Sequence, residues 1–331
     1  MTTNTQIKDL KTGEMVELYG VVSVFEERTK TDNSKYVELR VEDKSGTIDG
    51  KIWDISIKDL PQIEVGKLVK IRGLIKEWNS KKQLHIQKHP STNEPLIRLT
   101  TEEDGVNIDD YLKCAPIETK LMLEDLKNVI NNFSNEDIKL ICAKFVEEYK
   151  NELLCYPGAQ NLHHSVKGGL LYHIHTMLNV ATPIADNYPN INNDLLFAGV
   201  ILHDIGKIRE LDVDENGKAS KYTDEGYLLG HAIQGIKMLN EIVFSINTER
   251  DVKLDKSVVL LLEHMIASHH FDEMWGAYQK PAFLEAEILH HLDMIDSRVN
   301  MVNNVTETLE PNTFSERQWF LNDRRIYKPA L

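Results

Sequence analysis

The segment LLFAGVILHDIGK, residues 195–207, is an apolar run that ends in histidine, aspartate and lysine side chains. The run predicts a buried helix, and Gly206 predicts its end. Successive residues on a helix point about 100° apart, so His203 and Asp204 can reach one ion only near a helix terminus. Taken alone, the His-Asp pair predicts a metal site no better than it predicts an ordinary helix end.

Other histidines and carboxylates accompany this pair, and together they predict a metal centre. Eleven of the thirteen histidines lie between His163 and His291. Imidazoles hold divalent cations without cancelling their charge, whereas a carboxylate such as Asp204 can bridge two cations. A paired-metal site of this composition suits the hydrolysis of a phosphodiester at neutral pH. The candidate ligands are, in chain order, His173, His203, Asp204, His231, His269, His270 and Asp293.

Spacing chooses between neighbouring candidates in two places. His175 follows His173 by two residues, and residues two apart do not share a helix face, so only one of them is expected to coordinate. The apolar residues just before it favour His173. Asp293 and Asp296 lie three residues apart on one helical stripe. One carboxylate completes the site, and we favour Asp293 with Asp296 as the alternative.

Lys207 follows the His-Asp pair closely enough to offset negative charge on a phosphate or a leaving oxygen. Its position at a helix end is equally typical of a lysine that interacts with the helix dipole. No nucleophilic side chain is required, because hydroxide generated at a metal can attack phosphorus directly. We therefore expect the catalytic residues to be Asp204, as the bridging ligand, and Lys207.

The N-terminal part of the chain has a different pattern. Residues 12–88 alternate apolar and polar residues over short runs, which predicts β-strands at 17–25, 36–41, 47–53, 68–76 and 83–88. The strand-turn-strand segment YVELRVEDKSGTIDGKIWD, residues 36–54, resembles the core of the five-stranded OB-fold barrel. We expect an OB-fold nucleic-acid-binding domain over residues 1–90.

Charge divides along the chain in the same way. Residues 1–100 carry 17 Lys and Arg against 15 Asp and Glu, which leaves 21 against 37 for the remainder of this chain of formal net charge −14. A net-positive OB-like domain beside an acidic hydrolase favours nucleic acid as the partner. Singly, each candidate residue is also explained as barrel core or solvated surface. The candidates for base stacking and backbone contact are Tyr36, Trp53, Trp78, Lys81 and Lys82.

The rest of the chain predicts a linker, a helical bundle and a tail. Residues 91–117 contain prolines around an acidic cluster and predict the linker. Apolar residues then recur with helical spacing over 118–308, where Ser134 and Asp137 resemble a capping box. Bundles build metal sites from side chains on facing helices. Residues 309–331 form a C-terminal tail whose partner the sequence does not identify.

Several observations predict a cytoplasmic protein that does not enter a membrane. No apolar run approaches the length of a membrane span. The N-terminal residues lack the basic start and apolar stretch of a signal peptide. The three cysteines are far apart and form no CxxC pair, which fits a reducing compartment.

Read together, these residues resemble the HD-domain metallo-phosphohydrolases, and more closely the YhaM-type 3′–5′ exoribonucleases. The resemblance rests on NLHHSVKGGLLYHIHTML, ILHDIGKIREL, GHAIQG, SHH and EAEILHHLDMID, in that order after an OB-like domain. It implies a multidomain α+β fold, with the barrel before an all-α HD-domain bundle, and the metal ligands given above. His163 and His164 match a His-rich family segment and are candidates for substrate contact or for support of the ligands. Tyr172 stands where family members commonly have Glu.

The resemblance also implies an activity. It implies 3′–5′ degradation of single-stranded RNA by two-metal phosphodiester hydrolysis, with single-stranded DNA as a second candidate substrate. Two divalent ions are expected, Mn²⁺ first, with Fe and Co as alternatives. We expect a homo-oligomer of unknown subunit number. Two other functions stay open: an HD-domain phosphohydrolase acting on a nucleotide or cyclic dinucleotide, and a non-catalytic OB-fold RNA-binding protein with structural metal.

Overall fold

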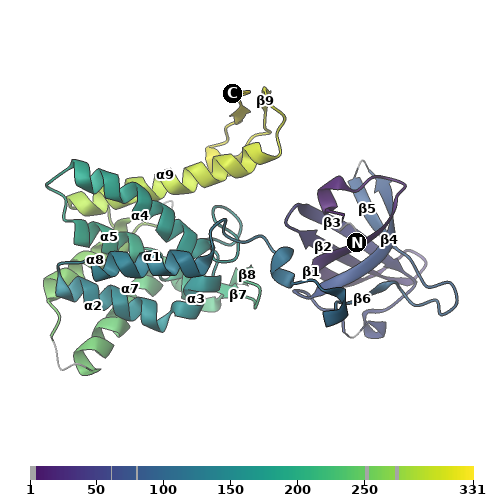
Figure 1. Ribbon diagram of the computed structural model, residues 1–331, viewed down its shortest axis with the longest axis horizontal. Coiled ribbons are helices and arrows are strands. Elements are labelled where there is room, and N and C mark those ends of the chain that lie inside the picture. The colour runs from purple at the N-terminus through teal and green to yellow at the C-terminus, as the bar shows by residue number, and fades with distance from the viewer. Residues whose placement is uncertain (1–4, 61, 80, 250–252, 273–275) are drawn as a thin grey trace. The chain divides into compact units, whose positions relative to one another are not determined.

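The computed structural model describes residues 5–60, 62–79, 81–249, 253–272 and 276–331. The chain divides into two compact units, Met1–Cys114 and Ala115–Leu331. The first is built of strands and the second of helices, as Figure 1 shows. The multidomain α+β architecture predicted from the sequence is therefore confirmed. None of the described helices is both long enough and apolar enough to cross a membrane.

Five long strands of the N-terminal unit close into a barrel. Neighbours pair in the order β1-β2-β3-β5-β4, and β1 also pairs with β4, which completes the ring (Figure 1). The β3–β5 pair is parallel and the other pairs are antiparallel. All five predicted strands are present. Their bounds are β1 Met15–Thr29, β2 Lys35–Asp43, β3 Gly46–Trp53, β4 Leu68–Trp78 and β5 Lys81–Ile86.

Strand β1 can pair with two neighbours because it bends. Its first half pairs with β4 and its second half with β2, and the register with β2 shifts between Val22 and Val24. A bulge of this kind increases the local twist and turns the strand round the barrel. In β2, Val37, Leu39 and Val41 face the buried core while the residues between them face outward. The alternation seen in the sequence is therefore the alternation between barrel core and barrel surface.

The predicted linker mostly belongs to the N-terminal unit, because the two units divide at Cys114. Within the segment expected to be a linker, a short strand β6 (Ile97–Leu99) pairs antiparallel with β4. Tyr111 and Leu112 are buried against Val21 and Leu68 of the barrel. The prolines and acidic residues of the segment suggested an irregular connection. The apolar residues among them anchor it to the barrel.

The C-terminal unit is a helical bundle with a short hairpin, β7 (Leu211–Val213) and β8 (Ala219–Tyr222), that the sequence did not predict. The apolar run of helix α5 is buried except for the half-buried Phe197, and the helix packs against α2, α4, α8 and α9. The end of α5 therefore lies inside the bundle. The helices are α1 Thr119–Asn131, α2 Glu136–Glu148, α3 Lys150–Cys155, α4 Gly169–Asn187, α5 Asn193–Leu202, α6 Lys207–Glu210, α7 Asp224–Glu249, α8 Lys256–Ser268 and α9 Leu284–Glu307.

Two details differ from the sequence-based expectations. The side chain of Asn135, and not that of Ser134, caps α2 by accepting a hydrogen bond from the Ile138 N–H. Asp194 accepts the backbone N–H groups of both Ser134 and Asn135, which ties α2 to α5. The predicted tail is also structured. It forms a two-stranded sheet, β9 (Thr313–Phe314) with β10 (Tyr327–Lys328), that follows the end of α9 (Figure 1).

Candidate metal centre

The turn after α5 carries the His-Asp pair. The helix ends at Leu202, so His203 and Asp204 lie in the turn that leads to α6. Gly206 has helical φ and ψ and does not itself end α5, contrary to the prediction. A Cβ atom on Gly206 would lie 1.8 Å from the backbone oxygen of His231. The glycine is required because this turn packs directly against the backbone of α7.

A kink places the next candidate ligand. Gly230 interrupts α7 with a φ of 67°, and His231 begins the segment that follows. The Glu210 carboxylate accepts the backbone N–H of His231 at 2.9 Å and lies 3.1 Å from its Nδ1 atom. The sequence analysis gave Glu210 no role, although it closes the motif ILHDIGKIREL. Glu210 fixes both the start of this helical segment and the orientation of the imidazole.

Four candidate histidines share one arrangement: Nδ1 bonds to a carbonyl or carboxylate oxygen, and Nε2 faces the other ligands. Such a hydrogen bond sets the tautomer and leaves the Nε2 lone pair for a cation. Asp296 was predicted only as an alternative ligand. In the structure it instead bonds to Nδ1 of His173 and so orients a candidate ligand. The Nδ1 partners are Asp296 for His173 at 2.7 Å, Val200 O for His203 at 2.9 Å, Glu210 for His231 at 3.1 Å and Ile266 O for His269 at 2.8 Å.

The first cluster of ligand atoms joins α4, the turn after α5 and α9. Nε2 of His173 lies 3.2 Å from Nε2 of His203 and 3.4 Å from Oδ1 of Asp293. Oδ2 of Asp204 lies 3.3 Å from Nε2 of His203 and 3.7 Å from Nε2 of His173. Two imidazoles and two carboxylates thus converge in a buried space. That donor set suits a divalent first-row metal.

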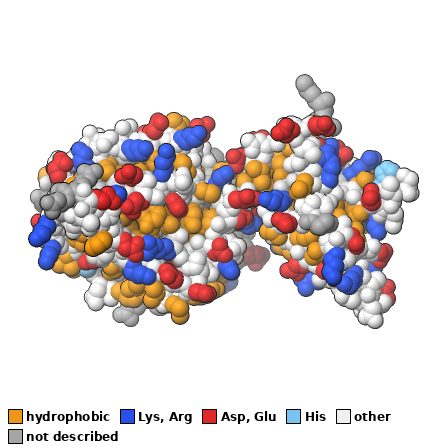
Figure 2. All heavy atoms as spheres, turned by 90° about the horizontal axis from the view of Figure 1, so that it is seen from below, with side chains coloured by type: hydrophobic (Ala, Val, Ile, Leu, Met, Phe, Trp, Pro, Cys, Tyr) orange, Lys and Arg blue, Asp and Glu red, His pale blue; other side chains and the backbone are white. Residues whose placement is uncertain are grey.

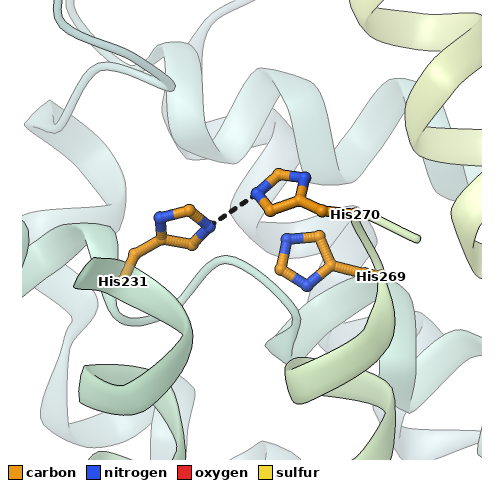
Figure 3. Close-up of side chains that lie close together, drawn as sticks. All are labelled: His231, His269 and His270. Atoms are coloured by element: carbon orange, nitrogen blue, oxygen red, sulfur yellow. Dashed lines mark hydrogen bonds between the residues drawn. The ribbon is translucent and has the colours of Figure 1, made fainter. Parts of the chain in front are cut away.

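The second cluster consists of His231, His269 and His270. Figure 3 shows the three rings facing one another, with His231 from α7 and the pair from the end of α8. Nε2 of His231 lies 2.9 Å from Nε2 of His270. Oδ1 of Asp204 lies 3.6 Å from Nε2 of His231 and 3.8 Å from Nε2 of His269. His269 and His270, which directly follow the last residue of α8, therefore belong to the same cluster of ligand atoms.

Asp204 lies between the clusters and points one carboxylate oxygen at each. Within the described part of the chain, its Oδ1 atom and Nε2 of His269 are buried without a hydrogen-bond partner. Burial of unpaired polar atoms is costly, so a native structure normally supplies a partner for them. Ligand atoms of both clusters lie close enough together to hold metal ions. The residues present therefore fit two divalent cations that share Asp204.

Burial acts differently on the pKa values of three histidines of the centre. Burial lowers the pKa of His269 well below its ordinary value and that of His270 to about 4, so both are neutral near pH 7. Burial also opposes the charged form of His173, but hydrogen bonds with Asp293 and Asp296 outweigh it and raise its pKa to about 9. In the metal-free protein a proton on Nε2 of His173 therefore lies against the Asp293 carboxylate, and a bound cation would replace it.

Lys207 points into the same space. Its Nζ atom lies 2.6 Å from Oδ2 of Asp204, and the side chain is buried. Burial disfavours the ammonium form, but the Asp204 charge outweighs it and raises the pKa of Lys207. A permanent positive charge therefore stands beside the carboxylate. Lys207 is not an ordinary solvated lysine at a helix end.

The two histidines before α4 lie near the centre in different surroundings. Nε2 of His164 lies 2.6 Å from Oδ2 of Asp296, and the side chain is buried against the ring of Tyr172. This geometry favours support of Asp296 over the predicted contact with substrate phosphate. His163 is half-buried with its ring 5.7 Å from that of His173. Its Nδ1 atom has no hydrogen-bond partner among the described residues.

The predicted nucleic-acid residues of the barrel fall into two places. Tyr36 and Trp53 pair across β2 and β3 on the outer face, with ring centroids 5.0 Å apart and the Lys51 ammonium over both rings. Trp78 is two-thirds exposed beside the exposed Lys81 at the β4–β5 turn. The Lys82 ammonium instead bonds to the backbone oxygen of Leu10 at 2.6 Å. Figure 2 shows acidic and basic side chains intermingled on one face of both units.

Both units match known domain families. Residues 16–88 match the OB-fold nucleic acid binding domain and residues 170–298 match the HD domain. The fold and the ligand set thus define an HD-domain protein with an N-terminal OB-fold.

Proteins named 3′-5′ exoribonuclease YhaM are similar over almost the whole chain. The one from Bacillus licheniformis is 35% identical over 319 residues, which are 96% of each chain. The one from Bacillus subtilis is 34% identical with the same coverage. A Listeria monocytogenes protein is 34% identical over 98% of this chain and 99% of its own. The chain belongs to the YhaM family.

Proposed function

We propose that this protein is a metal-dependent 3′–5′ exoribonuclease that shortens single-stranded RNA at its HD-domain centre. The observation that carries the proposal is the position of Asp204, with one carboxylate oxygen toward each histidine cluster. The relatives over nearly the full chain bear the name of this activity. The barrel supplies a second, independent reason, because aromatic rings beside lysines are typical of single-strand binding surfaces.

Seven residues would hold two cations. Bound cations would neutralise phosphate charge and lower the pKa of a water molecule, which makes it a nucleophile. Asp204 would serve both positions. The first cation would be held by His173, His203, Asp204 and Asp293, and the second by Asp204, His231, His269 and His270.

The remaining side chains orient these ligands and supply charge. Lys207 fixes Oδ2 of Asp204 and adds positive charge where the phosphate would lie. Asp296 and Glu210 hold the rings of His173 and His231. Hydrolysis adds water across the terminal phosphodiester: its oxygen joins the phosphate of the released nucleoside 5′-monophosphate, and a proton goes to the 3′-oxygen of the shortened chain.

We also propose the metal, a second substrate, the cellular location and the assembly. We propose manganese as the metal, because a His and carboxylate donor set accepts manganese, iron and cobalt alike and the family resemblance favours the first. Single-stranded DNA is a second substrate, since stacking on Tyr36 and Trp53 does not depend on the 2′-hydroxyl. We also propose a cytoplasmic homo-oligomer. Light scattering of the purified protein measures the subunit number directly.

Single-stranded RNA labelled at its 5′ end, incubated with manganese, tests the proposed activity. The wild-type protein should give a ladder that shortens from the 3′ end and releases nucleoside monophosphates. Asp204→Ala should leave the RNA intact. Asp212→Ala, a matched change at an exposed aspartate of β7, should degrade it at the wild-type rate. Intact RNA with the wild-type protein, together with hydrolysis of a small nucleotide, would replace this proposal by the small-molecule phosphohydrolase.

A further inference from the structure

A cavity of about 130 Å³ opens beside the metal centre, between the loop before α4, the helix α9 and the C-terminal segment. Its lining includes His270 and Asp293, which are candidate metal ligands, and His163 with its unpartnered Nδ1 atom. A molecule in the cavity would therefore be within reach of a phosphate at the metal centre. The proposed mechanism uses His270 and Asp293 of this lining and gives the other residues of the cavity no role.

Part of the lining is apolar and consists of Leu162, Met294, Met301 and Phe320. Polar groups of His290, Ser297 and Arg298 also line the cavity. An engineered cavity of about 150 Å³ with apolar walls binds benzene, so the space suits one flat ring system. Methionine side chains adapt to rings of different outline and make favourable contacts with them. This combination of an apolar wall and a phosphate-facing floor fits a nucleoside attached to a phosphate.

Phe320 reaches the cavity because the C-terminal segment folds back onto α9. Arg298 on α9 donates from Nη1 to the backbone oxygen of Phe320 and from Nη2 to Oδ1 of Asn322, each at 3.3 Å. Leu321, between them, is fully buried. Asn322 has a left-handed backbone, which ends the short turn Trp319–Leu321. The segment is thereby fixed on both sides of Phe320, which is half-buried and lines the cavity.

We propose that this cavity binds the 3′-terminal nucleoside of the RNA, with the Phe320 ring stacked on its base. The inference rests on the proposed exoribonuclease function and adds the C-terminal segment to the substrate-binding site. A terminal nucleoside in the cavity places its 5′-phosphate toward His270 and Asp293. The cavity is sized for one base and not for two, so the scissile bond is the last one and the product is a mononucleotide.

The test combines a change in the protein with a change in the RNA. Phe320→Ala and Phe320→Leu remove the aromatic face, and Phe314→Ala removes a phenyl ring of the same segment that does not line the cavity. Each is assayed with intact RNA and with RNA whose 3′-terminal nucleotide lacks its base. Manganese-dependent binding of uridine 5′-monophosphate to the full-length proteins gives a readout without turnover. Thermal unfolding shows whether each variant is folded.

Loss of one base–aromatic stack is expected to raise KM for intact RNA about 5- to 150-fold in Phe320→Ala. Phe320→Leu should lie between it and the wild type, and Phe314→Ala should match the wild type. Removal of the terminal base should raise KM of the wild-type protein as much as Phe320→Ala raises it for intact RNA. In Phe320→Ala, removal of the base should raise KM by less than about a further twofold. The dissociation constant for uridine 5′-monophosphate should rise in parallel with KM.

The two proposals fail in different ways. Wild-type protein that leaves RNA intact contradicts the exoribonuclease function, and uridine 5′-monophosphate binding then decides the cavity by itself. Wild-type protein that shortens RNA, with folded Phe320 variants of unchanged KM and nucleotide affinity, overturns the cavity assignment alone. An equal fold-increase in KM for the abasic end in wild type and in Phe320→Ala also overturns the cavity assignment, because the base and the ring would then act independently.

Discussion

Asp296 accepts hydrogen bonds from two histidines of the centre. One carboxylate oxygen lies 2.7 Å from Nδ1 of His173 and 2.6 Å from Nε2 of His164. Burial raises the pKa of Asp296, but hydrogen bonds from these histidines outweigh it and lower the pKa below its usual value. The carboxylate is therefore an ionised acceptor that holds the ring of His173. This role is distinct from that of Asp293, whose oxygen faces Nε2 of His173.

Asp296→Asn should weaken metal binding without abolishing it. An amide accepts one of the two hydrogen bonds less well, and changes of this kind behind a metal ligand typically cost 10- to 100-fold in affinity or activity. Titration with manganese should show a 10- to 100-fold higher concentration for half-maximal RNA cleavage. Asp186→Asn, at an exposed position on α4, is the control. An unchanged manganese requirement in Asp296→Asn would contradict the role assigned to this carboxylate.

The depressed pKa values of the histidines make the metal-free protein sensitive to acid. His270 has a pKa of about 4 in the folded chain against about 6.5 in the unfolded chain, and that of His269 is lowered too. The unfolded state therefore binds protons first as the pH falls below 6.5, which favours unfolding. The raised pKa of His173 acts in the other window: its stabilisation is complete below 6.5 and is lost as the pH rises toward 9.

Denaturant unfolding in the presence of a chelator measures this effect. Between pH 6.5 and pH 4 the free energy of unfolding should fall by about 2–3 kcal/mol for His270 alone. His270→Gln should remove that part of the slope. A metal-free protein whose stability is constant across this window, with the same slope in His270→Gln, would contradict the account of the buried histidines.

Two glycines of the helical elements are needed for different physical reasons. Gly206 has ordinary helical dihedrals, but a Cβ atom there would overlap the backbone of His231. Gly230 has a φ of 67°, with no atom within 4 Å of an added Cβ atom. The first glycine is required by packing and the second by backbone conformation.

Alanine at each position should separate these effects. Gly230→Ala should cost about 1–3 kcal/mol, because φ 67° with ψ 165° is a backbone conformation essentially confined to glycine. Gly206→Ala must push α6 away from α7 at His231, so it should cost more than this and also lower manganese affinity, because His231 moves. Denaturant unfolding and manganese titration of the two variants provide the comparison. Normal manganese affinity in Gly206→Ala would show that the turn does not position His231.

The sequence predicted those strands and helices whose apolar residues recur with a local periodicity. The five strands and the long helices follow from alternation and from helical spacing, and each ligand candidate lies on or next to an expected element. What it missed depends on tertiary contacts. The role of Gly206 comes from the backbone of α7, and Asp194 caps α2 from a distant helix. The support that Glu210 gives His231 likewise becomes visible only in three dimensions.

The predicted linker, residues 91–117, was judged by its composition alone. Prolines and acidic residues predicted a linker, yet Tyr111 and Leu112 bury themselves against the barrel. The tail shows the same limit. The sequence did not identify what the tail contacts, and only the fold shows that Phe320 lines a cavity beside the metal centre.

The barrel is proposed to bind RNA and the helical unit to cleave it, and a change in the barrel tests this assignment. Trp53→Ala should weaken binding of single-stranded RNA by about 1–3 kcal/mol, because one stacking ring is lost. Fluorescence anisotropy in the presence of a chelator measures this binding without cleavage. Cleavage of a dinucleotide, too short to need the barrel, should be unchanged. Tyr188→Ala, at an exposed tyrosine of the helical unit, is the control. Unaltered RNA affinity in Trp53→Ala would remove this face from the binding surface.

We propose that Asp204 joins two cation sites in one centre. Equilibrium dialysis against manganese, followed by elemental analysis, counts the ions bound per chain. The wild-type protein should bind two ions, and Asp204→Asn should lose both tight sites, because the amide cannot bridge as a carboxylate does. One ion per chain in the wild type, or two tightly bound ions in Asp204→Asn, would contradict it.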